Sequence, residues 1–132
     1  MIVLDASILA NALADDGPDG ATARTRLTDA GQLAAPDLID VETVAVLRKR
    51  WIAGDLTDQR FSDAIDDLAD LDLTRYPTLP LMRRAFELRA NVTAYDATYV
   101  AMAEQLHRTL LTADQRLAAA PTVTCPVEVL RP

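Results

Sequence analysis

The sequence opens with Ile2-Val3-Leu4-Asp5-Ala6-Ser7, a short run of apolar residues that stops at an aspartate. Such a run is typical of a buried strand, and the residues from about Ser7 to Ala14 have the apolar spacing of a helix. A second stretch, Leu110-Leu111-Thr112-Ala113-Asp114, ends in the same way. Because ligands of open α/β sheets bind beyond the carboxyl ends of the strands, Asp5 and Asp114 are candidate site residues. Each could also simply cap the helix that follows it.

The rest of the chain continues this alternation of strands and helices. Further strands are predicted at residues 33–36, 71–73, 109–113 and 127–130, and further helices at 21–30, 37–53, 57–71, 81–89, 93–107 and 115–119. Residues 16–20 form the clearest break, because glycine and proline interrupt the helical pattern there. The alternation favours an α/β fold with a mainly parallel sheet. Since the sequence shows no repeat or low-complexity tract, we expect a single domain over residues 1–132.

Composition and charge exclude several classes of protein. Half of the 132 residues are hydrophobic and a quarter are charged, which is a globular composition. The formal net charge of -7 disfavours passive binding of a polyanion, but it allows an enzyme that holds nucleic acid through metal ions. His107 and Cys125 are the only residues of their kinds, which excludes mechanisms that need two imidazoles or a cysteine cluster. Without a signal peptide or the roughly 20 apolar residues of a membrane span, we expect a cytoplasmic protein with no membrane contact.

Two further acids fall where a surface residue is unexpected. In the predicted helix over residues 37–53, Glu42 lies roughly 40° from Leu38 and Val46, inside an otherwise apolar arc. Asp96 fits a capping box, yet it also heads the stripe of its helix that should face the core. Carboxylates about 4 Å apart would repel by roughly 4 kcal/mol at an effective dielectric constant near 20, so protons or divalent cations must offset the repulsion. A carboxylate set without His or Cys suits Mg²⁺ or Mn²⁺ and metal-assisted phosphoryl transfer.

With these residues in place, the sequence resembles the PIN-domain ribonucleases, and in particular the VapC toxins of bacterial toxin–antitoxin pairs. The resemblance rests on residues 2–7, 37–47, 95–103 and 110–114, whose order and spacing are more specific than any one segment. It extends over nearly the whole chain. The resemblance implies a three-layer α/β/α sandwich with a mainly parallel central sheet and a recessed site formed by four acids.

The resemblance also implies the chemistry of that site. Asp5, Glu42, Asp96 and Asp114 would bind Mg²⁺ directly or through water, with Mn²⁺ able to substitute. Ser7 or Thr112 would orient ligands through hydroxyl hydrogen bonds. The implied activity is endonucleolytic cleavage of single-stranded regions of cellular RNA, which leaves a 5′-phosphate and a 3′-hydroxyl.

Partners are implied by the same family. They are a VapB-like antitoxin, whose C-terminal segment lies across the toxin and blocks the acidic pocket, and a second copy of the chain in a homodimer. The predicted helices carry more apolar side chains than one core-facing stripe requires, at Ile8, Leu9, Leu13, Leu47 and Trp51. These side chains could contact a partner or pack in the core. Residues 48–50 are basic and could meet RNA phosphates, although a solvated helix end explains them equally.

Two other acidic α/β classes fit the sequence less well. A phosphoacceptor receiver module needs a lysine after a late strand, but the only lysine, Lys49, lies within a predicted helix. A phosphatase of the haloacid-dehalogenase type needs a second aspartate two residues after the first, where Ser7 stands. A PIN-like binding module with a degenerate site remains as the alternative to an enzyme. Manganese-dependent RNA cleavage that Asp5→Asn abolishes would distinguish the two.

Overall fold

Five short parallel strands form the centre of the computed structural model, which describes all residues from Met1 to Pro132. The strands are β1 (Ile2–Leu4), β2 (Leu33–Pro36), β3 (Thr74–Tyr76), β4 (Leu110–Thr112) and β5 (Val127–Val129). Their order in the sheet is β3-β2-β1-β4-β5, and every neighbouring pair is parallel. All residues of β1 are buried, because this strand lies between β2 and β4 at the middle of the sheet. The prediction of a mainly parallel sheet is confirmed.

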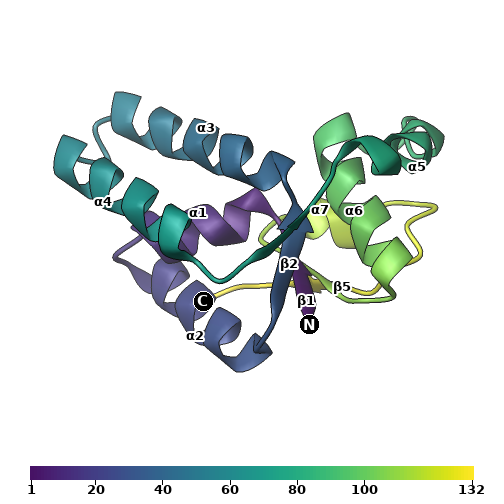
Figure 1. Cartoon of the computed structure of the whole chain (residues 1–132), viewed down its shortest axis with the longest axis horizontal. Helices are drawn as coiled ribbons and strands as arrows, with labels where there is room; N and C mark the ends of the chain where they lie inside the picture. The colour runs from purple at the N-terminus through teal and green to yellow at the C-terminus, as the bar shows by residue number, and fades with distance from the viewer.

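Helices cover both faces of this sheet (Figure 1). On one side lie α1 (Ala6–Ala14), α2 (Pro18–Ala30), α3 (Leu38–Ile52) and α4 (Asp58–Asp70), which pack on one another around α1. On the other side α6 (Ala94–Leu106) contacts β1, β2 and β4 and is itself covered by α5 (Met82–Glu87) and the 3₁₀ turn η1 (Leu79–Leu81). The short helix α7 (Gln115–Ala118) packs against β5. This arrangement is the three-layer α/β/α sandwich that the resemblance implied.

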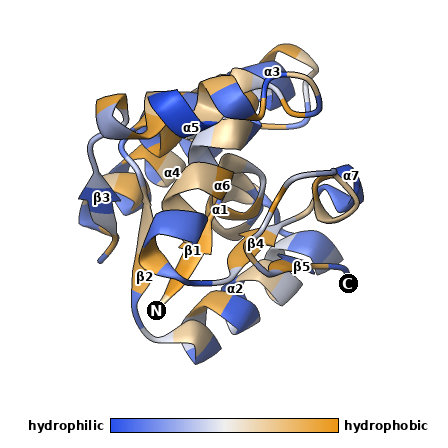
Figure 2. Ribbon diagram, turned by 90° about the vertical axis from the view of Figure 1, so that its right-hand side faces the viewer, coloured by the Kyte–Doolittle hydropathy of each residue, from blue (hydrophilic) through white to orange (hydrophobic).

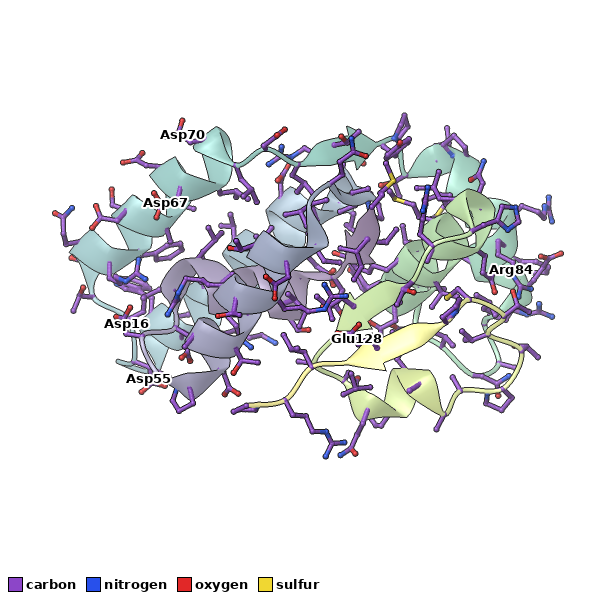
Figure 3. All side chains as sticks on the ribbon, turned by 90° about the horizontal axis from the view of Figure 1, so that it is seen from below. Asp16, Asp55, Asp67, Asp70, Arg84 and Glu128 are labelled. Atoms are coloured by element: carbon purple, nitrogen blue, oxygen red, sulfur yellow. The ribbon has the colours of Figure 1, made fainter.

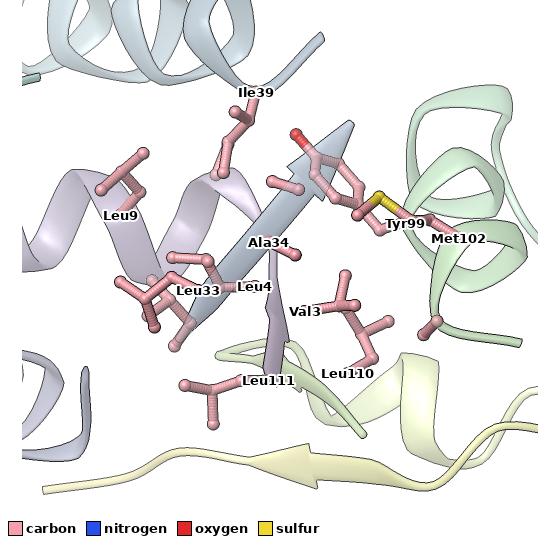
Figure 4. Packing of buried hydrophobic residues seen from close by; sticks show 14 of the residues in the cluster. Val3, Leu4, Leu9, Leu33, Ala34, Ile39, Tyr99, Met102, Leu110 and Leu111 are labelled. Atoms are coloured by element: carbon pink, nitrogen blue, oxygen red, sulfur yellow. The ribbon is translucent and has the colours of Figure 1, made fainter. Parts of the chain in front are cut away.

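The core is one cluster of 32 buried hydrophobic residues that extends through the sheet. Figure 4 shows Tyr99 and Met102 of α6 on one side of the strands and Leu9 of α1 on the other, with Val3 and Leu110 between the layers. The central strand β1 is correspondingly hydrophobic along its whole length and β4 is hydrophobic up to Thr112, whereas the outer helices alternate between polar and apolar surface (Figure 2). The carboxyl ends of β1 and β4 are therefore fixed within a rigid, fully packed centre.

Two elements begin three residues away from their predicted starts, whereas the other predicted elements begin within one residue of theirs. The strand expected at residues 71–73 lies at Thr74–Tyr76, where it pairs with β2 at the edge of the sheet. Its polar sequence gives no strand pattern, and it is held by Arg75, which forms an ion pair with Asp40 of α3 at 2.8 Å. The helix expected from residue 21 begins at Pro18. Proline is favoured at the first position of a helix, because the backbone N–H that it lacks would have no partner within the helix there.

The apolar residues that could have been partner contacts divide between core and surface. Ile8, Leu9, Leu13 and Leu47 are buried, so core packing accounts for them. Trp51 is 45% exposed, and its indole N–H donates to Asp58 Oδ1 at 2.6 Å. Only Trp51 of this group therefore stays available to a partner. A search of the helices for a membrane span finds none with the required length and apolar content.

Candidate active site

Asp5 lies where β1 ends and α1 begins, and its carboxylate accepts four hydrogen bonds. Oδ1 accepts the backbone N–H groups of Ser7 at 3.1 Å and Ile8 at 3.3 Å and the Ser7 hydroxyl at 2.5 Å. Oδ2 accepts the hydroxyl of Thr112. Burial raises the pKa of Asp5, the hydrogen bonds from Ser7, Thr112 and Ile8 oppose this rise, and the charge of Asp96 adds to it. Asp5 is thus both a helix cap and a buried acid that is costly to ionise.

Ser7 and Thr112 connect Asp5 to the end of β4. Besides donating to Asp5, the Ser7 hydroxyl accepts the N–H of Ala113 at 3.1 Å, and the Thr112 hydroxyl accepts the N–H of Asp114 at 3.0 Å. Thr112 is fully buried. The two hydroxyls therefore set the position of the Asp5 carboxylate relative to the backbone that carries Asp114.

Glu42 lies in the first half of α3 and is half-buried, as its place in the apolar arc predicts. Its Oε1 accepts the phenolic hydroxyl of Tyr99 at 2.5 Å, and Figure 4 shows that hydroxyl pointing toward the amino-terminal end of α3. Burial raises the pKa of Glu42, the bond from Tyr99 opposes this rise, and the charges of Asp96 and Asp5 add to it. Burial and the neighbouring acids also raise the pKa of Tyr99, so Tyr99 stays a neutral donor.

Asp96 lies in the first turn of α6 and is also half-buried. Its backbone N–H donates to the N-cap hydroxyl of Thr93 at 3.2 Å, so the predicted cap at Thr93 is present. Burial raises the pKa of Asp96, and the charge of Asp114 raises it further, whereas Thr93 and Arg116 oppose the rise. The Asp96 side chain therefore interacts electrostatically with the charged pair Asp114 and Arg116 that follows β4.

Asp114 is the N-cap of α7 and is the one acid of the four that forms an ion pair. It accepts the backbone N–H of Arg116 at 2.9 Å, and its two oxygens accept Nε and Nη2 of that arginine at 3.1 and 3.0 Å. These contacts lower the pKa of Asp114. The guanidinium of Arg116 therefore occupies the position that a cation at Asp114 would take.

The four acids influence one another's charge, but they do not line one pocket. Asp96 and Asp114 line a hollow of about 170 Å³, whereas Glu42 lines a second hollow of about 320 Å³ and Asp5 is buried beneath Ser7 and Thr112. No three acidic, histidine or cysteine side chains lie close enough together to share one ion in this arrangement. Two contacts accompany this separation of the acids. Tyr99 binds Glu42, and Arg116 binds Asp114.

Two residues of this site were not assigned their roles from the sequence. Tyr99 fits the core stripe of α6, and nothing in that pattern indicates that its hydroxyl reaches Glu42 in another helix. Arg116 lies at the start of a short predicted helix, and no pattern there predicts its contact with the Asp114 side chain. A basic residue two positions after an N-cap aspartate was the one signal that could have marked the ion pair with Asp114.

Comparisons with known proteins identify the family to which this fold belongs. Residues 2–122 match the family model of the PIN domain. Ribonuclease VapC9 of Mycobacterium tuberculosis is 41% identical over 130 residues, which cover 98% of this chain and 98% of the relative. The crystal structure of VapC20 from the same organism, a sarcin–ricin loop cleaving toxin, superimposes with a TM-score of 0.69 at 17% identity and covers 90% of this chain and 94% of that one.

A third comparison extends the agreement to a complex. The structure of VapBC2 from Rickettsia felis, bound to a DNA fragment from its promoter, gives a TM-score of 0.66 at 16% identity, with 98% of each chain covered. At these identities the two structures support the fold alone. The family match over most of the chain and the near-complete alignment with VapC9 carry the assignment. The chain belongs to the VapC group of the PIN-domain family.

Proposed function

We propose that this chain is an endoribonuclease toxin that hydrolyses phosphodiester bonds in single-stranded regions of cellular RNA in the cytoplasm. The proposal rests on the burial of Asp5. This residue follows the central strand, is 6% exposed and forms no ion pair. A buried charge without a counter-ion is costly, and the neighbouring acids Glu42 and Asp96 increase that cost. A cation from solution would offset it, and the ribonuclease names of relatives such as VapC9 support the same activity.

The donor set fits a hard divalent cation. Asp5, Glu42, Asp96 and Asp114 supply carboxylate oxygens, and Ser7 and Thr112 lie beside them with hydroxyl groups. Mg²⁺ prefers such oxygen ligands, and Mn²⁺ accepts them. The four acids would hold the ion. Because no three of them lie close enough together to share it in the present arrangement, Glu42 and Asp114 would have to exchange their contacts with Tyr99 and Arg116 for the ion. When bound, the ion would activate water at neutral pH and stabilise charge on the scissile phosphate.

The chain's own residues prepare these acids. Ser7 and Thr112 fix both oxygens of Asp5, and Tyr99 stabilises the charged form of Glu42. Arg116 is 89% exposed along its side chain and lies in the hollow with Asp96 and Asp114, so its guanidinium would contact the RNA phosphate at that position. The contacts of Ser7 and Thr112 would hold Asp5 in place before the substrate arrives, which lowers the reorganisation needed at this ligand during the reaction.

We also propose a VapB-like antitoxin and a homodimer as the partners of this toxin. The similarity to the VapBC2 structure supports the antitoxin, and the acidic site of this chain would attract a basic segment of such a partner. An antitoxin that covers the site would keep RNA away from Asp96 and Asp114. This control would explain how a cell could carry an active nuclease.

The test is to express the chain without its antitoxin and to map the 5′-phosphate ends of cellular RNA. We expect discrete new ends in single-stranded loops, which disappear when Asp5→Asn is expressed at the same level or when the antitoxin is co-expressed. If Asp5→Asn gives the same ends in the same amounts, the proposed chemistry is wrong. If the wild-type chain binds RNA but produces no ends, it is a PIN-like binding module.

A further inference from the structure

A second hollow adjoins the acidic site on the side of Glu42. It has a volume of about 320 Å³ and lies between the outer face of α3 and the start of α6, with Glu42, Val41, Lys49 and Tyr95 among its lining residues. This volume is at the lower end of the range of small-ligand sites. Of the four candidate acids, Glu42 alone lines this hollow, and Tyr95, which also lines it, directly precedes Asp96 in the sequence.

Tyr95 brings an aromatic ring to this hollow. It directly precedes Asp96 and lies four residues before Tyr99, so the two tyrosines share one side of α6. Tyr99 is buried and binds Glu42, whereas Tyr95 is 58% exposed and has no hydrogen-bond partner among the side chains. Core packing therefore does not explain the ring of Tyr95, which lies within reach of a ligand at Glu42 and Asp96.

The α3 side of the hollow carries a positive charge. Leu38, Glu42, Ala45 and Lys49 follow one another at spacings of four, three and four residues, which places them along one face of α3. Lys49 takes part in none of the six ion pairs of the chain. Val41, also in this hollow, is 71% exposed. The surface thus combines an aromatic ring, an apolar floor and an unpaired ammonium group.

We propose that this hollow binds one unpaired base of the RNA substrate next to the scissile phosphate, with the base stacked on Tyr95 and a neighbouring phosphate on Lys49. The inference rests on the proposed ribonuclease function and adds a positioning residue to it. Proteins that bind single-stranded RNA stack its bases on exposed aromatic rings and track its backbone with basic groups. An apolar protein segment would offer no counter-charge to the unpaired Lys49, whereas an RNA phosphate would, which favours RNA as the occupant.

A larger hollow elsewhere on α3 is a weaker candidate for RNA. It has a volume of about 430 Å³ and lies between α3 and α4, where Trp51, Phe61 and Ile65 line it together with one acid, Asp58, and one base, Arg48. Figure 3 shows Asp16, Asp55, Asp67 and Asp70 at that end of the molecule, away from Arg84. These carboxylates would repel a phosphate backbone, so the strand would leave the acidic site along the Tyr95 side.

The experiment uses a single-stranded oligouridine that contains one 2-aminopurine, bound in EDTA so that metal-dependent cleavage cannot occur. Stacking on Tyr95 should quench the 2-aminopurine fluorescence. Tyr95→Ala should weaken binding about 5- to 150-fold and abolish the quenching, whereas Tyr95→Phe keeps the ring and should restore both. Lys49→Gln should lower the salt dependence of binding by about 0.7 in log–log slope. Phe86→Ala is the matched control, because Phe86 is an exposed aromatic residue, 52% exposed, on α5.

The outcomes separate this inference from the proposed function. If the wild-type chain cleaves RNA but Tyr95→Ala binds and cleaves as the wild type does, the base site is refuted while the nuclease stands. If Tyr95→Ala changes only the oligomeric state or antitoxin binding, the hollow is a protein interface and the inference is again refuted. If the wild type cleaves nothing but shows Tyr95-dependent quenching, the base site stands and the nuclease proposal fails. Circular dichroism of each variant confirms that it is folded.

Discussion

Tyr99 Oη of α6 and Glu42 Oε1 of α3 are 2.5 Å apart, and this contact joins the two helical layers on opposite sides of the sheet. Tyr99 is 1% exposed, whereas Glu42 is only half-buried. The phenol is therefore a fixed donor that holds a partly accessible carboxylate at the edge of the candidate site. A hydrogen bond to a charged group contributes about 1.5–3 kcal/mol, so this pair affects both stability and the charge of Glu42.

Replacement of Tyr99 by Phe should show how far the stability of the protein and the charge of Glu42 depend on this hydrogen bond. The phenolic hydrogen bond lowers the pKa of Glu42 against the effect of burial, so its loss should raise the pKa of Glu42 further. The free energy of unfolding should fall by about 1–3 kcal/mol. Carbon-detected NMR titration of the Glu42 carboxyl and urea denaturation measure the two effects, with Tyr95→Phe as the control. A Glu42 pKa that stays constant or falls would contradict the assignment.

The hydroxyl of Thr112 should matter to Asp5 in a similar way. Thr112→Val removes a fully buried donor to Asp5 Oδ2 and leaves the shape of the side chain nearly unchanged. We expect the pKa of Asp5 to rise and the protein to lose about 1–3 kcal/mol of stability, because a buried acceptor loses its partner. Thr112→Ser retains the hydroxyl and should return the Asp5 pKa to the wild-type value. NMR titration of Asp5 in the two variants tests this prediction. Equal Asp5 pKa values in Thr112→Val and Thr112→Ser would show that the Thr112 hydroxyl does not stabilise the charged form of Asp5.

The buried acids predict a distinctive pH dependence of stability in EDTA. Burial raises the pKa of Asp5 in the folded state above its value in the unfolded chain, which is about 4. At pH values between these two pKa values, the folded state therefore binds more protons than the unfolded state. This contribution to stability is present at low pH and is lost as the pH rises. Asp5→Asn removes the titration but keeps a good helix cap. The free energy of unfolding of Asp5→Asn relative to wild type should therefore increase from pH 4 to pH 8.

That difference is measured by urea denaturation of both proteins at several pH values. Comparison of the two proteins cancels the opposite contributions of Asp114, Glu104 and Glu128, whose lowered pKa values favour folding at higher pH. The expected increase is about 1.4 kcal/mol for each unit by which folding raises the Asp5 pKa. A difference that is constant with pH would show that Asp5 titrates normally in the folded state.

Arg116 should compete with a metal ion for Asp114. Its guanidinium contacts both carboxylate oxygens, so Arg116→Gln should free them and lower the dissociation constant of Mn²⁺ several-fold. The free Mn²⁺ signal in electron paramagnetic resonance measures this constant without RNA. Arg89→Gln is the control, because Arg89 lies over the ring of Phe86, away from the acids. Weaker Mn²⁺ binding in Arg116→Gln would mean that the arginine supports the metal centre instead.

The parts of the fold that the sequence predicts well are those with unbroken apolar patterns. β1 and β4 are short buried runs with an aspartate after each, and the structure places both beside each other in the sheet. Glu42 was found because a polar residue interrupts an apolar helical arc. Patterns of this kind reflect burial directly, so the structure confirms the elements that they predict.

The features that the sequence could not predict depend on contacts between distant elements. β3 is an edge strand with a polar sequence, and its position follows from pairing with β2 and from the ion pair between Arg75 and Asp40. The hydrogen bond of Tyr99 with Glu42 spans 57 positions of the chain. The division of the acids between two hollows likewise follows from the partners that each carboxylate finds. No local pattern contains that information.

The most direct test of the metal-site proposal is the cleavage rate of a single-stranded RNA as a function of Mg²⁺ or Mn²⁺ concentration, for wild type and Asp5→Asn. We predict a rate for wild type that saturates with metal and vanishes in EDTA, and a decrease of at least about 100-fold for Asp5→Asn, which corresponds to roughly 2.7 kcal/mol of lost transition-state stabilisation. Cleavage that continues unchanged in EDTA, or an Asp5→Asn variant that is as fast as wild type, would contradict the proposal that these acids form a catalytic metal site.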